Sequence, residues 1–144
     1  MDNRKKIIWK RIKIFLLVAG LLLLVGTPVF LYFRLSTEGR LALRQAKNVK
    51  LQLEMIDIEY YALGKSVYDV SGNHGLSDGV LERVRSFMEN SCEVSITSYN
   101  RSTRTVLGFI YTNDKYQVIY SYDEEKGDCW QVNYILKLKE YDGQ

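Results

Sequence analysis

One histidine and two cysteines are the side chains in this sequence best suited to acid–base or nucleophilic chemistry. His74 lies in "SGNHGL", a run of turn-forming residues, whereas a general base needs a polar partner and a cleft. We therefore interpret His74 as a turn residue. His74, Cys92 and Cys129 lack the spacing of metal ligands, and no glycine-rich phosphate loop is present. The sequence predicts no enzyme, cofactor, metal site or small-molecule substrate.

Acidic residues cluster near the end of the chain, at Asp123, Glu124, Glu125 and Asp128. Calcium favours carboxylate ligands, but this spacing matches no known calcium loop, so we expect a solvated hairpin turn. The triplet "NRS" at Asn100 matches an N-glycosylation acceptor, whose use depends on the organism.

Tyrosine is unusually frequent, with 11 copies in the chain. Tyrosine favours strands and half-buried faces, so packing in a sheet is the expected role of the copies near the predicted strands. A binding face is the alternative role. The copies concerned are Tyr99, Tyr111, Tyr116, Tyr120, Tyr122 and Tyr134. Their surroundings match no nucleic-acid-binding motif, so we expect no nucleic acid as a partner.

The first element that the sequence predicts is a membrane segment near the N-terminus. No charged residue occurs between Ile14 and Phe33, and a helix of this length spans about 30 Å, the thickness of a bilayer core. No small-residue cleavage pattern ends the run, which favours an uncleaved anchor over a signal peptide. The dense basic flank before it predicts a single-pass protein of the cell membrane, with a cytosolic N-terminus and an extracytoplasmic C-terminal domain.

An apolar and small-residue seam follows, with spacings that alternate between four and three residues, as on one face of a helix. It contains Leu35, Gly39, Ala42, Ala46, Val49, Leu53, Ile56, Tyr60 and Leu63. Gly64 suits a helix C-cap, and no breaker separates the seam from the membrane segment, so one continuous helix is expected. The small residues allow close approach by another helix, or they are simply lightly packed. The large ones are expected to form a core with the sheet and Trp130.

The remaining residues predict a short helix and four strands. The stretch "SDGVLERVRSFMEN" reads as a helix capped by Ser77 or Asp78, with an apolar face of Val80, Leu81, Val84, Phe87 and Met88. The strands lie in "CEVSITSY", "RTVLGFIY", "KYQVIYSY" and "CWQVNYILKL", joined by short connections typical of hairpins. The last strand places Trp130, Val132, Tyr134, Leu136 and Leu138 on one side.

The predicted fold is α+β, with a four-stranded antiparallel meander covered on one face by the long and short helices. Cys92 and Cys129 begin the first and fourth strands, which run in opposite directions. They are therefore expected at opposite ends of the sheet, as two free thiols. The predicted segments are a basic cytosolic flank (1–13), a transmembrane helix (14–33), an amphipathic extension (34–64) and an extracytoplasmic α+β domain (65–144).

This order of parts resembles the type IV pilin and pseudopilin family. Pro28, followed by Phe30 and Phe33, and the later stretches "STEG" and "EYYALG" match features of pilin helices. The family's processed chains carry a glutamate at their fifth residue, and Arg11 occupies the corresponding position here. "KKII" stands where the prepilin peptidase would cleave. The chain therefore resembles a divergent member that lacks both the peptidase site and the glutamate.

Two functions remain open. The resemblance implies a structural or accessory subunit of a type IV pilus or type II secretion-type machine, embedded in the bilayer and packed against other membrane helices, pilin-like subunits among them. Its expected helix-packing residues are Pro28, Gly39, Ala42 and Ala46. The alternative is a single-pass protein with an independent extracytoplasmic protein-binding domain that does not assemble into a filament.

Overall fold

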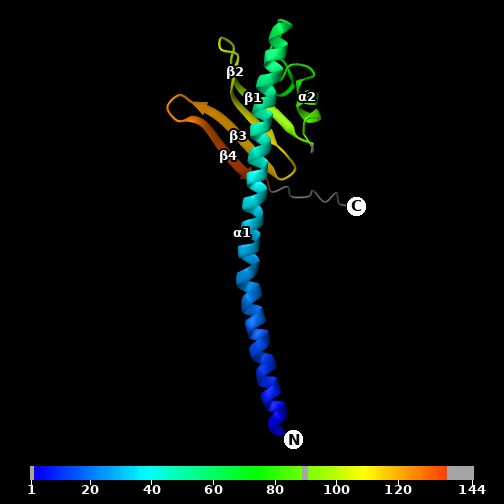
Figure 1. Ribbon diagram of the computed structural model, residues 1–144, viewed down its shortest axis with the longest axis vertical. Helices are drawn as coiled ribbons and strands as arrows, with labels where there is room; N and C mark the ends of the chain where they lie inside the picture. The colour runs from blue at the N-terminus through cyan, green and yellow to red at the C-terminus, as the bar shows by residue number, and fades with distance from the viewer. Residues whose placement is uncertain (1, 89–90, 136–144) are drawn as a thin grey trace, which may run out of the picture. The chain divides into compact units, whose positions relative to one another are not determined.

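The computed structural model describes residues 2–88 and 91–135 and confirms the predicted α+β layout (Figure 1). A long helix is followed by a 3₁₀ turn, a short helix and four strands. Their bounds are α1 (Asp2–Ala62), η1 (Asn73–Gly75), α2 (Val80–Ser86), β1 (Glu93–Asn100), β2 (Thr105–Thr112), β3 (Tyr116–Asp123) and β4 (Gly127–Tyr134). The predicted continuous helix is α1, which passes through Pro28 and ends just before Leu63.

The chain forms two compact units; the first ends at Glu38 and the second begins at Gly39. In the first unit, the most apolar window of α1 has a mean hydropathy of 2.7, and none of it is buried inside the protein. By length and composition, this helix can cross a membrane. The Thr27 hydroxyl donates a hydrogen bond to the Leu23 carbonyl at 2.6 Å. Pro28 has no N–H for the Leu24 carbonyl, so the helix loses one backbone bond there.

The sheet of the second unit has the order β1-β2-β3-β4 with every pair antiparallel, which confirms the predicted meander. One face is covered by the part of α1 that begins at Gly39 (Figure 1). The register places Phe109 beside Ile96 and Tyr120 on this inner face. The buried residues that α1 contributes to the same core are Ala42, Ala46, Val49, Leu53 and Ile56. Val49, Leu53 and Ile56 thus confirm the predicted contact of the helix with the sheet.

The end of α1 is closed by Gly64, as predicted. Gly64 has φ +68°, a left-handed conformation that glycine adopts without steric cost. The Lys65 N–H donates to the Tyr60 carbonyl at 2.9 Å, and the Gly64 N–H donates to the Tyr61 carbonyl at 3.0 Å. This pattern is a Schellman motif, which satisfies carbonyls that the end of the helix leaves without donors.

Leu63 corrects the predicted core. It was expected to continue the seam, but 69% of its surface is exposed because α1 ends one residue earlier and Leu63 lies in the closing turn. Tyr60 and Trp130 are partly buried and pack against the core, as expected. In β4, Val132 and Tyr134 are exposed although they share the inner face with Trp130, while Leu136 and Leu138 lie outside the described residues.

The start of α2 also differs from the prediction. Gly79, with φ 81°, is the N-cap residue, and no side chain caps the helix. The Ser77 hydroxyl instead donates to the Ser66 carbonyl at 2.6 Å, which ties two parts of the preceding loop together. Val80 and Val84 are buried as expected, but Phe87 is exposed because it follows the last helical residue.

Both cysteines are free thiols, in agreement with the prediction from strand order. Cys92 is buried immediately before β1, and burial raises the pKa of its thiol. Cys129 is partly exposed in β4, where it lies opposite Ser121 of β3.

Candidate functional site

His74 lies exposed in η1, with a positive φ of 59°. Its backbone carbonyl accepts a hydrogen bond from the Ser95 hydroxyl at 3.3 Å. Among residues 8–88 and 91–135, whose side chains the structure describes, no group of three or more His, Cys, Asp or Glu side chains is arranged to hold a metal ion.

The acidic residues near the chain end separate into two roles. Asp123 accepts hydrogen bonds at 2.9 Å from the backbone N–H groups of Glu125 and Lys126, so it organises the β3–β4 turn. Asp128 instead reaches α1, where its carboxylate accepts a hydrogen bond from Lys50 at 2.9 Å. The predicted solvated hairpin turn is therefore confirmed for Asp123, Glu124 and Glu125, but not for Asp128, which contacts α1.

The tyrosines of the sheet pack inward. Tyr111, Tyr116 and Tyr120 are buried in the core, which confirms the packing role for these three. The Tyr111 hydroxyl donates to the side-chain oxygen of Gln45 on α1 at 3.0 Å. Tyr122, at the hairpin end of β3, is exposed. A continuous tyrosine binding face is therefore not formed.

The small residues of α1 face the protein's own sheet. Ala42 and Ala46 are 1% and 0% exposed, so the expectation that they receive another helix is wrong. A methyl group at Gly39 would lie 3.7 Å from a ring carbon of Tyr116. The physical reason is that bulky aromatic side chains of the sheet fill the space that the small residues leave. Pro28 lies in the first unit and is exposed.

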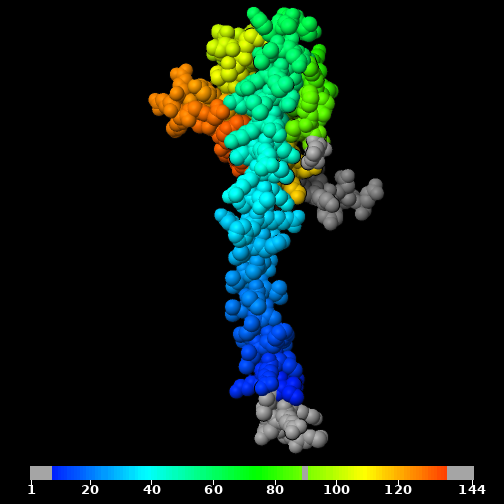
Figure 2. All heavy atoms as spheres, viewed as in Figure 1, coloured from blue at the N-terminus to red at the C-terminus, as the bar shows by residue number. Residues whose placement is uncertain are grey.

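A second apolar stripe runs along the opposite face of α1. Leu51, Met55 and Ile58 are 57%, 55% and 71% exposed. They follow the buried residues Val49, Leu53 and Ile56 by two positions, which is about 200° around a helix. Figure 2 shows this part of α1 as an uncovered ridge. Leu51, Met55 and Ile58 are spaced by four and three residues in the sequence. The seam that begins at Leu35 is a longer pattern of the same kind and was the only one predicted.

The stripe ends beside a groove between the end of α1 and the β1–β2 turn. The groove has a volume of about 340 Å³, and the guanidinium of Arg104 lies 4.9 Å from the centre of the Tyr61 ring. Such a cation–π contact orients both side chains. Its lining is Glu54, Asp57, Ile58, Tyr61, Thr103, Arg104 and Thr105.

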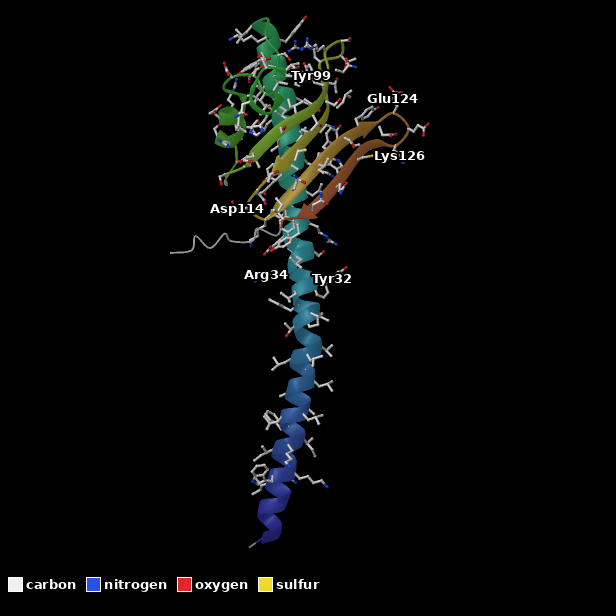
Figure 3. The ribbon with its side chains drawn as sticks, turned by 180° about the vertical axis from the view of Figure 1, so that it is seen from behind. Tyr32, Arg34, Tyr99, Asp114, Glu124 and Lys126 are labelled. Carbon is white, nitrogen blue, oxygen red and sulfur yellow. The ribbon has the colours of Figure 1, made fainter. Side chains whose placement is uncertain are left out.

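Asp57 forms the polar floor of this groove and is 3% exposed. Its carboxylate accepts hydrogen bonds from Arg104 at 2.8 Å, the Tyr99 hydroxyl at 2.9 Å and the Val67 N–H at 2.8 Å. Figure 3 shows Tyr99 beside α1 at this end of the sheet. A buried charge costs several kcal/mol unless it is paired and hydrogen-bonded, as it is here. Sequence reasoning placed Asp57 off the seam and missed the cluster, because its partners lie far along the chain.

Lys50 lies next to Leu51, at the end of the stripe away from the groove. Its ammonium lies 4.5 Å from the centre of the Tyr120 ring and donates to Asp128. Burial alone would lower the pKa of Lys50, but the contacts with Tyr120 and Asp128 outweigh it and raise the pKa. The hydrogen bonds from Lys50 and then Tyr120 lower the pKa of Asp128.

No family model, curated protein or solved structure matches the chain. The resemblance to pilins therefore depends on the motifs of α1 and remains a prediction. What the geometry itself provides is an exposed apolar helix face on a domain whose membrane-competent helix precedes it.

Proposed function

We propose that this protein is a membrane-anchored, pilin-like structural or accessory subunit of a type IV pilus or type II secretion-type machine. It acts by packing α1 against neighbouring helices and performs no catalysis. The observation that carries this proposal is the exposed stripe of Leu51, Met55 and Ile58 on a helix whose other face is packed.

The stripe is preorganised for binding. Val49, Leu53 and Ile56 fix the rotation of α1 on the sheet, so the opposite side chains are presented in one fixed array. An apolar helix face is a common recognition surface, read through residues spaced three and four apart. Three neighbouring apolar side chains in a row, rather than scattered singly, are also typical of an interaction site.

The membrane segment supports the same function. Gly20 and Gly26 have no heavy atom within 4 Å of the position that a Cβ would take. Small residues let helices approach closely in a bilayer. Because Arg11 replaces the glutamate of the family, assembly would depend on such packing rather than on that glutamate's charge.

A second candidate is an independent protein-binding domain on a single membrane anchor. The groove floored by Asp57 and walled by Tyr61 favours it, because the groove can accept one side chain of a partner. This function differs from the first in leaving α1 without neighbouring helices in the membrane.

The proposal is tested with the full-length protein in its native membrane. A tagged copy is solubilised and purified with its bound proteins, alongside a variant carrying Met55→Glu and Ile58→Glu. A matched control carries Gln117→Glu and Gln131→Glu on the other face of the sheet. We expect the α1 variant to lose its membrane partners and the control to keep them. A wild-type protein purified alone, or equal loss in both variants, would refute the proposal.

A further inference from the structure

We propose that the outward face of α1 binds the tip of the β3–β4 hairpin of a second copy of this chain. This inference rests on the proposed function and names one partner in it. Two surface patches of opposite charge, each beside exposed apolar side chains, carry the argument.

The first patch is the basic part of the outward face of α1. Arg40 and Arg44 are exposed and lie in helical register with Leu51, at spacings of four and seven residues. Within the described part of the chain, neither arginine side chain makes a hydrogen bond or an ion pair. Lys47 is exposed beside them, so the outward face changes from basic to apolar along the helix.

The second patch is the tip of the β3–β4 hairpin. Asp123, Glu124 and Glu125 outnumber Lys126, and all four are exposed. Figure 3 shows Glu124 and Lys126 at the outer end of the hairpin. Glu124 and Glu125 have no ion-pair partner among the side chains of residues 8–88 and 91–135. Tyr122 lies next to them and is 48% exposed, so this patch combines acidic and apolar surface as the first combines basic and apolar surface.

The two patches do not meet within one molecule. The hairpin is tied to α1 at Lys50 by Asp128. Arg44 and Arg40 precede Lys50 by about 9 Å and about 15 Å of helix, at 1.5 Å per residue. A second copy, parallel and displaced along the axis of α1 by on the order of 10–15 Å, brings its arginines level with the hairpin of the first.

Such a contact joins different surfaces of the two copies. Each copy then keeps one free helix face and one free hairpin, so the same contact can repeat along an array. The charged residues would set the orientation of the two copies and speed their encounter, and salt would weaken this attraction. Leu51 of one copy against Tyr122 of the other would supply the apolar contact.

The test uses two reciprocal charge reversals in the full-length protein. The helix variant carries Arg40→Glu and Arg44→Glu, and the hairpin variant carries Glu124→Lys and Glu125→Lys. Each variant has like charges on both patches, but a mixture of the two has opposite charges at every contact. Two differently tagged copies are co-expressed, solubilised in neutral detergent and co-purified. The control reverses Arg101→Glu and Asp114→Lys, exposed residues at other turns of the sheet.

We expect wild-type copies to co-purify at low salt and each variant alone to show at least about tenfold less recovery. The mixed variants should recover to within about twofold of wild type, and the control should match wild type. Recovery in the mixture also shows that both variants fold. No co-purification of wild-type copies, no recovery in the mixture, or equal loss in the control would overturn the inference.

Three outcomes show whether this inference and the proposed function stand or fall together. If wild-type copies fail to co-purify but the Met55→Glu, Ile58→Glu variant still loses other membrane partners, the inference fails and the proposed function stands. If neither self-association nor other partners are found, both fail. A third outcome is that only the helix variant loses co-purification and also binds less to vesicles of anionic lipid. Arg40 and Arg44 then bind lipid, and the inference is wrong.

Discussion

The carboxylate of Asp57 accepts a hydrogen bond from Arg104 at 2.8 Å, joining the last turns of α1 to the β1–β2 turn. The same guanidinium donates to the backbone carbonyls of Asp57 at 3.1 Å and Lys65 at 2.9 Å. Arg104 adopts a positive φ of 55°, which is uncommon for a residue with a side chain. One side chain therefore fixes the helix end, the loop after it and the turn that forms the groove.

Replacing Arg104 with Met is expected to lower the free energy of unfolding by about 3 kcal/mol, because it leaves a buried carboxylate without its counter-charge. Tyr99→Phe should cost about 1 kcal/mol by removing one hydrogen bond to the same carboxylate. Denaturation of the full chain, followed by Trp130 fluorescence in a Trp9→Phe background, measures both. Adding Asp57→Asn to Arg104→Met should recover part of the loss. A loss below about 0.5 kcal/mol for Arg104→Met would mean that the pair is not buried in solution.

Acid should weaken the contact between Lys50 and Asp128. The pKa of Asp128 is lowered below its ordinary value of 3.8, first by the hydrogen bond from Lys50 and then by that from Tyr120. A lowered pKa contributes stability above the ordinary pKa, and this contribution is lost as pH falls through the lowered value. The melting temperature of Asp128→Asn should therefore fall less than that of wild type between about pH 5 and about pH 3. Asp114→Asn should follow wild type, and identical profiles for all three proteins would contradict the assignment.

A larger side chain should stabilise the fold at Gly39 and destabilise it at Ala46. At Gly39 an added methyl meets only ordinary contacts, at 3.7 Å and 3.9 Å, so Gly39→Ala should stabilise the fold by up to about 1 kcal/mol through helix propensity. Ala46 is fully buried, so Ala46→Leu should destabilise it by about 1–3 kcal/mol through overpacking. Thermal melts of the two variants provide the comparison. If Ala46→Leu leaves the melt unchanged, α1 does not lie on the sheet through this residue.

The two thiols should differ in reactivity. Cys129 is partly exposed, whereas Cys92 is buried and the pKa of its thiol is raised by burial. Maleimide should therefore add once to the native protein, at Cys129, and twice after denaturation. Intact mass should not change with a reductant. A mass increase of two hydrogen atoms on reduction would reveal a disulfide and contradict the strand order.

Local patterns in the sequence were sufficient for much of the fold. The spacing of Val49, Leu53 and Ile56 predicted the buried face of α1, and Gly64 predicted where the helix closes. Four β-rich segments with short connections predicted the meander, and the meander in turn predicted two free cysteines. These features depend on residues close in sequence, whose preferences act within one or two turns.

The interaction surface was less accessible to the same reasoning. The size of Ala42 and Ala46 suggested space for a partner, but the sheet's own aromatic residues occupy it, which only the tertiary packing decides. The cluster around Asp57 was not found from the sequence, because Tyr99 and Arg104 lie more than forty residues after Asp57. Leu51, Met55 and Ile58 could have been found from their spacing, since a helix with two apolar faces needs a partner on each.

The most direct test of the interaction surface is photo-crosslinking in intact membranes. A photoreactive phenylalanine analogue is placed at Met55 of the full-length protein, and at Gln131 as a matched exposed position on the other face of the sheet. We expect Met55 to form a specific covalent adduct with a neighbouring membrane protein, a second copy of this chain included, and Gln131 to form none. Equal labelling at both positions, or a protein that remains monomeric at both, would contradict a role for the outward face of α1.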